Sequence, residues 1–385
     1  MSTMLAPAPR LPLRSLVRRD PVGGAWAALA GQRAVPTWAT RVGIRAACDL
    51  LGLKPGDAVL VPAYNCGSEI DALLDARLAL LPYAVGADLV VRAEVLEQAI
   101  TPGVKAIYLT HYFGLPQPEG QAIRALCDRH GLALMEDCAL SLLSQTGRLG
   151  DVAFHCFYKY FPVGSGGALV VNRADLPLPQ IDRKPPARPA LKLLGQALAF
   201  AVLGPSGIGA LKSLRRRLRK PRAGGGAERQ DFPDMPRDYY FDPGLKGARM
   251  SWLVARALGG MSLVQAIAAR QANFRTYQRL LAGVPGARPL IAELPEGACP
   301  LNMPVLVADR DRLARELGEL GIAVAPWWAG YHRALDFTPF AEARHLKDNV
   351  LALPLHQGLT EAQIAAVVAA LKERLQALGR FQAPE

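Results

Sequence analysis

Cysteines are few, and no two of them stand at a metal-binding or redox spacing. Six occur in 385 residues, and none forms a Cys-x-x-Cys pair. This absence argues against a structural zinc site and against a small domain held together by disulfides. We therefore expect free thiols in a reducing compartment, and no metal centre.

Long apolar runs are also missing. The first twenty residues contain four arginines and no apolar stretch of the length that a signal peptide needs. Residues 193–211 lack charge, but Gly204-Pro205-Ser206-Gly207 interrupts them, which argues against a transmembrane helix. The default expectation is a cytoplasmic protein.

Acidic residues are absent from one segment, and this explains the basic balance of the chain. Eleven lysines and arginines and no acid lie between Arg183 and Arg222, so only +1 of the formal charge of +12 remains for the other residues. The basic run lacks interleaved aromatics, which argues against a nucleic-acid partner. Residues 191–222 then have two interpretations: peripheral contact with anionic lipid at the inner membrane face, or an apolar helix on the body followed by a solvated basic loop.

The apolar spacing elsewhere predicts alternating helices and strands, which is typical of α/β proteins. Helices are expected at 41–53, 69–76, 93–100 and 121–130, and strands at 58–62, 78–83, 104–114, 132–135, 151–157 and 168–172. A long helical region at 251–283 follows, and then a strand, a helix and a strand between 301 and 328. Gly131 is expected to cap a helix at its C-terminus, and Thr360 with Gln363 to cap the last helix at its N-terminus.

Two polar residues stand out at 132–167. Asp137 follows Glu136 at the carboxyl end of a predicted strand, where open α/β sheets bind ligands. Lys159 stands among aromatics, shortly before the turn Gly164–Gly167. Pyridoxal phosphate (PLP) needs a lysine for its aldehyde, an acid for its pyridine nitrogen, and donors for its phosphate. The pattern therefore favours a PLP site, although a surface lysine and a capping aspartate are the plain alternatives.

Several motifs resemble those of the DegT/DnrJ/StrS-type sugar aminotransferase family. They are TRVGIRAACDLLGLKPGDAVLVPAYNC, HYFG, EDCALSLL, GDVAFHCFYKYFPVGSGGALVV and LPLHQGLTEAQ, and they cover most of the chain except 175–245. The resemblance implies PLP-dependent transferase fold type I. It predicts an N-terminal arm and a large domain with a central, mostly parallel sheet at 1–245, which includes a basic insertion at about 183–230. A smaller C-terminal α/β domain at 246–385 and a homodimer are also implied.

The resemblance also implies roles for individual residues. Lys159 matches the lysine that forms the Schiff base, and Asp137 matches the acid at the pyridine nitrogen. Thr40 and Arg41 match a phosphate-binding turn, with an N-cap and a surface arginine as the plain alternatives. Tyr64 or Cys66 falls at an aromatic position that stacks on the ring, with packing against the sheet as the plain alternative for Tyr64. His155 or Cys156 falls near a phosphate-contacting serine.

The activity that the resemblance implies is transfer of an amino group from glutamate to a keto nucleotide sugar in polysaccharide or glycan synthesis. Leu140 and Gly247 replace polar residues that the family usually has. They keep two alternatives open: another PLP reaction on the same fold, such as a sugar dehydratase, and a catalytically impaired member with a binding role. His111 and Tyr112, and the cluster Trp327, Trp328, Tyr331 and His332, are either site residues or packed core.

Overall fold

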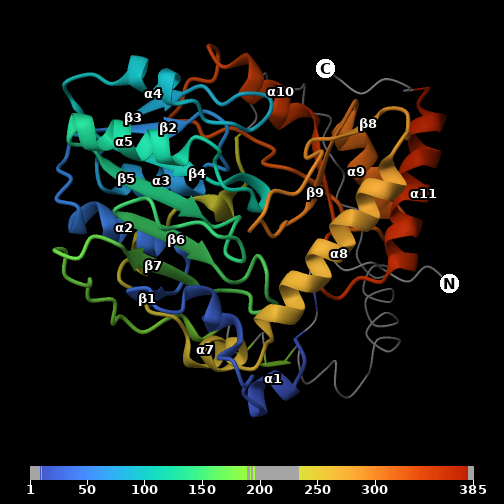
Figure 1. Cartoon of the computed structure of the whole chain (residues 1–385), viewed down its shortest axis with the longest axis horizontal. Helices are drawn as coiled ribbons and strands as arrows, with labels where there is room; N and C mark the ends of the chain where they lie inside the picture. The colour runs from blue at the N-terminus through green and yellow to red at the C-terminus, as the bar shows by residue number, and fades with distance from the viewer. Residues whose placement is uncertain (1–8, 10, 189–190, 192–193, 196–233, 380–385) are drawn as a thin grey trace.

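A computed structural model describes residues 9, 11–188, 191, 194–195 and 234–379 (Figure 1). Most of the basic segment, from residue 196 to residue 233, lies outside the described residues. The membrane contact and the basic loop expected at 191–222 therefore stay predictions.

The centre of the molecule is a seven-stranded sheet with the order β1-β7-β6-β5-β4-β2-β3 (Figure 1). Strands β2 to β6 run parallel to one another, and β7 and β1 add an antiparallel edge. The bounds are β1 Ala34–Thr37, β2 Ala58–Pro62, β3 Ala79–Tyr83, β4 Val104–Thr110, β5 Ala133–Cys138, β6 Val152–Cys156 and β7 Gly167–Val171. The predicted fold class is confirmed, although the sequence pattern did not predict β1.

Helices cover both faces of this sheet, as the buried apolar strands require. Apolar side chains of α2 (Thr40–Leu50) and α3 (Ser68–Asp75) pack on one face. Those of α4 (Ala93–Ala99) and α5 (Gly120–His130) pack on the other. Gly131 caps α5 in the left-handed conformation, with a φ of 63°, which confirms the predicted C-cap.

The C-terminal part contains a second, antiparallel sheet with the order β10-β11-β9-β8. Its strands are β8 Ala287–Pro289, β9 Met303–Val307, β10 Ala325–Pro326 and β11 Val350–Leu353, and its helices are α8 Leu263–Leu281, α9 Arg310–Glu319, α10 Ala341–Asn349 and α11 Glu361–Ala377. The predicted capping box on α11 is confirmed, because Thr360 and Gln363 each bond the other's backbone amide. The apolar core of this part is continuous with the core under β2, β4 and β5. The division at residue 245 stays a prediction.

The helical region predicted at 251–283 consists of two helices, α7 (Trp252–Leu258) and α8, bent by 69°. Gly260 lies at the break, where the chain passes against the end of α1 (Arg14–Val17). A Cβ atom on Gly260 would lie 2.2 Å from the carbonyl oxygen of Ser15, so this contact requires glycine. Within the described residues no single helix is long and apolar enough to cross a membrane, and α7 with α8 meets that test only as a bent pair.

Short 3-10 turns complete the chain and connect the longer elements. They are η1 Gly24–Leu29, η2 Tyr112–Gly114, η3 Arg237–Tyr239 and η4 Pro243–Leu245.

Candidate active site

A cavity of about 460 Å³ opens at the carboxyl ends of the parallel strands. Its walls come from the start of α2, the loops after β2, β5 and β6, and the segment 325–328. The lining residues are Trp38, Ala39, Thr40, Arg41, Ile44, Cys66, Ser68, Glu69, Asp137, Ala139, Leu140, Tyr158, Lys159, Gly164, Ser165, Tyr239, Ala325, Pro326, Trp327 and Trp328. The structure thus brings five of the seven predicted site residues together: Thr40, Arg41, Cys66, Asp137 and Lys159.

Asp137 is the buried acid of this cavity. It lies at the end of β5, and its Oδ1 accepts a hydrogen bond from the amide of Ala139 at 2.9 Å. Burial and the nearby Glu69 carboxyl raise the pKa of Asp137, while Lys159 acts against that shift. Ionisation of the Asp137 carboxyl is therefore disfavoured, and a further cationic partner in the cavity would stabilise the carboxylate.

Lys159 belongs to the loop between β6 and β7. Phe157, Tyr160 and Phe161 anchor this loop in the core, which leaves the lysine half-buried and facing the cavity. Burial lowers the pKa of the Lys159 amine, but the acidic groups around it outweigh burial and raise the pKa above its usual value. These groups are Cys156, Cys66, Asp137 and Glu69. The amine is thus a proton donor at neutral pH until a bound group changes its surroundings.

A buried arginine on α8 binds the backbone of the loop that carries Lys159. Arg270 is 1% exposed, and its Nη1 donates to the carbonyls of Leu355 at 2.7 Å and Leu301 at 2.9 Å. Its Nη2 donates to the carbonyl of Tyr160 at 3.4 Å, and Gln357 donates to the same carbonyl at 3.0 Å. The backbone next to Lys159 is therefore fixed by two side chains that are distant in sequence.

Replacing Arg270 by methionine should destabilise the protein by about 3 kcal/mol or more, because several buried carbonyls lose their donor at once. Urea unfolding measures the change. Arg279→Met is the matched control, since Arg279 lies on the same helix with a side chain that is 61% exposed and an ion pair to Glu361. That variant should change stability by less than about 1 kcal/mol. Equal unfolding midpoints for the two variants would disprove the role of Arg270.

The first turn of α2 forms another wall and offers amide donors. Amides in a first helical turn have no acceptor within the helix and lie at its positive end, which suits an anion. Gly167 permits the close approach of β7, since a Cβ there would lie 2.6 Å from the Thr40 amide nitrogen. The Thr40 hydroxyl donates to the carbonyl of His155 at 3.1 Å, and Arg41 donates to the carbonyl of Tyr239 at 2.7 Å.

Two predicted site residues, Tyr64 and His155, do not line the cavity. The Tyr64 ring packs against Tyr112 and Trp328, with ring centroids 5.4 Å and 4.9 Å away. His155 is the cross-strand partner of Cys138, so its ring lies on the face of the sheet opposite to Asp137. Its side chain is buried, no partner for either ring nitrogen is found among the described residues, and burial lowers its pKa to about 4.

The sequence pattern missed a second cavity acid, Glu69. Its carboxylate accepts from the Cys66 amide at 3.0 Å and from the Cys66 thiol at 2.7 Å. The available signal was an acid in the first turn of a predicted helix, three residues after Cys66, but that spacing also describes an ordinary cap. Only the fold shows that this helix begins at the cavity.

His111 and Tyr112 prove to be satisfied core residues. Tyr112 donates to the carbonyl of Tyr64 at 2.8 Å. The His111, Glu136 and Cys138 side chains bring three metal-type ligand atoms within 4.8 Å of one another. However, His111 Nδ1 accepts from the Gln117 amide at 3.0 Å, so Nε2 carries the proton and donates to Glu136 at 2.9 Å. A metal on Nε2 would need the opposite tautomer, and this cluster is better explained as a hydrogen-bonded unit.

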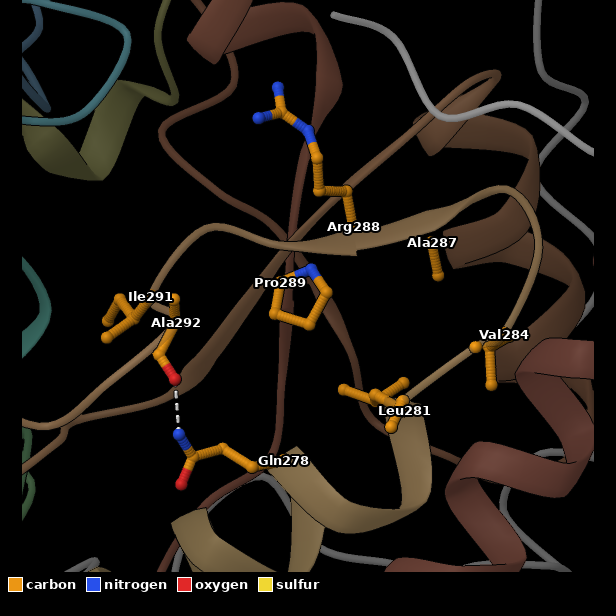
Figure 2. Close-up of a pocket in the computed structure, with 10 residues that line it drawn as sticks. Gln278, Leu281, Val284, Ala287, Arg288, Pro289, Ile291 and Ala292 are labelled. Atoms are coloured by element: carbon orange, nitrogen blue, oxygen red, sulfur yellow. Dashed lines mark hydrogen bonds between the residues drawn. The ribbon is translucent and has the colours of Figure 1, made fainter.

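A second cavity, of about 300 Å³, lies between the end of α8 and β8 (Figure 2). Gln278 bridges it by donating to the carbonyl of Ala292. Of its lining residues only Arg288 is charged, and Figure 2 shows that side chain pointing away from Leu281 and Gln278. This cavity lacks the acid and base that chemistry would require.

Comparison with known proteins places these features in a family. A model of the DegT/DnrJ/EryC1/StrS aminotransferase family matches residues 28–177 and 248–372. The matched ranges include every cavity residue except Tyr239.

Two curated relatives match part of the chain. A GDP-perosamine synthase from Vibrio cholerae is 30% identical over 142 residues, which cover 35% of this chain and 38% of the relative. A UDP-N-acetyl-3-dehydro-alpha-D-glucosamine 3-aminotransferase from Acidithiobacillus ferrooxidans is 34% identical over 140 residues, covering 33% and 36%. The chain thus spans little more than a third of the length of these relatives.

Solved structures match along nearly the whole chain, and DesI is an example. DesI, crystallised in the presence of its TDP-sugar product, has a TM-score of 0.68 and 19% identity. The match covers 98% of this chain and 96% of that chain. At 19% identity, this similarity shows the fold alone.

Proposed function

Because the chain belongs to the DegT/DnrJ/EryC1/StrS aminotransferase family, whose cofactor is pyridoxal phosphate, we propose that it transfers an amino group to a keto nucleotide sugar. Glutamate is the proposed donor, and synthesis of a polysaccharide or related glycan is the proposed role. The observation that carries the proposal is one cavity, at the carboxyl edge of the sheet, that contains a buried acid, a lysine and a helix N-terminus. The names of the two curated relatives support the class of substrate.

The cavity fits this cofactor by the chemistry of its donors. Burial and the Glu69 carboxyl raise the pKa of Asp137 although Lys159 acts against that shift, and a pyridinium nitrogen would be a second cationic neighbour that stabilises the carboxylate. The first turn of α2, with Thr40, supplies donors of the kind that a phosphate needs. Lys159 faces the same cavity with a primary amine. Proposed holding residues are therefore Lys159, Asp137, Thr40 and Arg41, with Cys66 on a side wall.

When bound, pyridoxal phosphate supplies an aldehyde and an electron-withdrawing ring. The chain's residues supply the rest. Asp137 holds a proton on the ring nitrogen, and the Ala139 amide orients its Oδ1. Lys159 Nζ gives and takes the proton at the reacting carbon of the substrate. Trp38, Trp327 and Trp328 line the cavity and would limit the access of water to the reacting atoms.

Tyr64 and His155 were also predicted as cofactor contacts. We propose instead that Tyr64 supports Trp328 from behind the cavity wall, because the two rings are in contact. His155 contributes through its backbone, since its carbonyl accepts from Thr40. Cys156 follows His155 along β6, so its side chain points to the same face of the sheet as Asp137, but it does not line the cavity.

Absorption spectra of the purified protein with pyridoxal phosphate test the function. Adding glutamate should remove the visible band of the bound cofactor and produce the near-ultraviolet band of the pyridoxamine form, and adding a keto nucleotide sugar should reverse the change. A cofactor band that no amino donor alters would exclude an aminotransferase and favour another PLP reaction. Failure to bind the cofactor would favour a catalytically impaired protein with a binding role. The observation behind this alternative is the apolar residue Leu140 in the cavity wall.

A homodimer is the proposed assembly. Trp252 on α7 is 77% exposed and Val17 on the adjoining α1 is 75% exposed, which supports an apolar contact surface there. We expect sedimentation velocity to show a dimer, and Trp252→Asp to weaken it. A wild-type chain that stays monomeric at micromolar concentration would contradict this assembly.

A further inference from the structure

Lys347 on α10 is a buried ammonium group outside the proposed catalytic machinery. Lys347 is only 1% exposed. Among the described residues, no carboxylate forms an ion pair with its ammonium group. Instead Nζ donates to three backbone carbonyls, those of Asn65 at 2.7 Å, Gly330 at 3.0 Å and Trp328 at 3.3 Å. The rings of Tyr331 and Phe337 lie 5.1 Å and 5.5 Å from the nitrogen.

The number of acceptors matches the chemistry of the group. An ammonium has three donors and no acceptor, so three carbonyls satisfy it completely. Three converging carbonyl oxygens and two ring faces also form a typical environment for a small cation. Burial lowers the pKa of Lys347 to about 8, which reflects the cost of keeping this charge away from water. Neither an apolar side chain nor an uncharged amide could replace it without leaving carbonyls unpaired.

The three carbonyls belong to two different walls of the cavity. Asn65 immediately precedes Cys66, which lines the cavity after β2, and Trp328 lines the part contributed by the segment after β10. Lys347 therefore links a wall of the seven-stranded sheet to a wall of the C-terminal part through hydrogen bonds, in addition to the ring contact between Tyr64 and Trp328. Loss of the ammonium would leave the two walls without these hydrogen bonds.

Backbone strain at Trp328 shows that this wall needs support. Trp328 has a φ of 50°, a conformation that is costly for a bulky residue and persists only where its surroundings impose it. Its carbonyl is one of the three that Lys347 binds, and Gly330, two residues later, provides another. The hydrogen bonds of the ammonium therefore act directly on the strained segment.

We propose that Lys347 is a positioning residue, a built-in cation that sets the spacing between the Cys66 wall and the Trp328 wall of the cofactor cavity. This inference rests on the proposed function, because it assigns the cavity to the cofactor. It concerns only the residues of this chain and predicts an effect on cofactor affinity.

Chemical rescue tests it. Lys347→Ala removes the atoms of a propylammonium ion and leaves the three carbonyls facing a hole. The probe is pyridoxamine 5′-phosphate, which has no aldehyde to react with an added amine, and its binding is followed by fluorescence. The Kd should rise at least tenfold in the variant and return toward the wild-type value with propylammonium, but not with 1-propanol. Lys347→Met, which fills the hole without a charge, should show the same loss and no rescue.

Two controls separate positioning from stability. Leu346→Ala truncates a fully buried neighbour on α10 and should lower the unfolding midpoint while the Kd for the probe stays within twofold of wild type. Lys372→Ala changes an exposed lysine on α11 and should change neither. An unchanged Kd in both Lys347 variants, or an equal loss of affinity in Leu346→Ala without amine rescue of Lys347→Ala, would overturn the inference. A wild-type protein that does not bind the probe would instead overturn the proposed function.

Discussion

Lys159→Ala should lose the visible absorption of bound pyridoxal phosphate and reduce the rate of amino transfer by about 10²-fold to 10⁴-fold or more. The lower figure reflects only the loss of the proton transfer by Nζ. Loss of the covalent bond to the cofactor adds to it. Spectra after dialysis, and single-turnover rates with glutamate, measure the two effects separately.

Lys105→Ala is the matched control for this prediction. Lys105 lies on β4 and is exposed, so its loss should leave both the spectrum and the rate unchanged. Lys159→Arg keeps the positive charge but cannot form the bond, and should behave like Lys159→Ala. A visible band that survives dialysis in either Lys159 variant would show that another residue holds the cofactor.

Asp137→Asn should act in opposite directions on activity and on stability. Without the negative charge the ring nitrogen loses its proton, and we expect kcat/KM to fall by about 10² to 10³, as for the loss of one preorganised electrostatic contact. The cofactor-free variant should be more stable than wild type at neutral pH. The reason is that asparagine resembles the protonated acid, which the buried site prefers.

The sign of the pH effect follows from the raised pKa of Asp137. The folded state binds the Asp137 proton more tightly than the unfolded state does. The contribution of this group to the free energy of unfolding is therefore fully present below its pKa in the unfolded state, and it is lost as the pH rises through its pKa in the folded state. The difference in free energy of unfolding between Asp137→Asn and wild type should therefore increase from pH 4 upward, by about 1.4 kcal/mol per pH unit, until the pH passes the pKa of Asp137 in the folded state. Urea unfolding of the cofactor-free proteins at several pH values measures it.

The neighbouring acid provides the contrast. Glu136 lies on the other face of β5 and accepts hydrogen bonds from the amides of Leu149 at 2.8 Å and Gly150 at 2.6 Å and from His111. Burial raises its pKa, but these bonds outweigh burial and lower it below the usual value. Glu136→Gln should therefore destabilise the protein where Asp137→Asn stabilises it. If both changes destabilise the cofactor-free protein at pH 8, the account of Asp137 is wrong.

Local chemistry explains why much of the fold was predictable. The strand at Ala58–Pro62 has the predicted bounds, because a short apolar run between a Pro-Gly-Asp turn and a polar loop has few alternatives. The caps at Gly131 and at Thr360 were predictable for the same reason, since each depends on residues within one turn of the helix. Asp137 could be singled out as a candidate site residue because it ends a predicted strand. Lys159 could be singled out because of its aromatic neighbours and the glycine turn that follows it.

The parts that escaped prediction depend on contacts that are distant in sequence. The bend at Gly260 is set by the passage of the chain near Ser15. The position of His155 on the far face of the sheet follows from one step of strand register, which reverses the direction of every side chain. Arg270 and Lys347 have no local signal for their roles, because their partners are brought to them only by the packing of the two sheets. Glu69 has a partner nearby in sequence, Cys66, but only the fold brings both residues to the cavity.

The most direct test of the central claim is to locate the cofactor on the chain. The protein is loaded with pyridoxal phosphate, reduced with borohydride, digested, and the modified lysine is identified by mass spectrometry. The account predicts modification at Lys159, within the loop between β6 and β7, and its loss in Lys159→Arg. Modification at Lys347 or another lysine, or none, would contradict the assignment of this cavity as the active site.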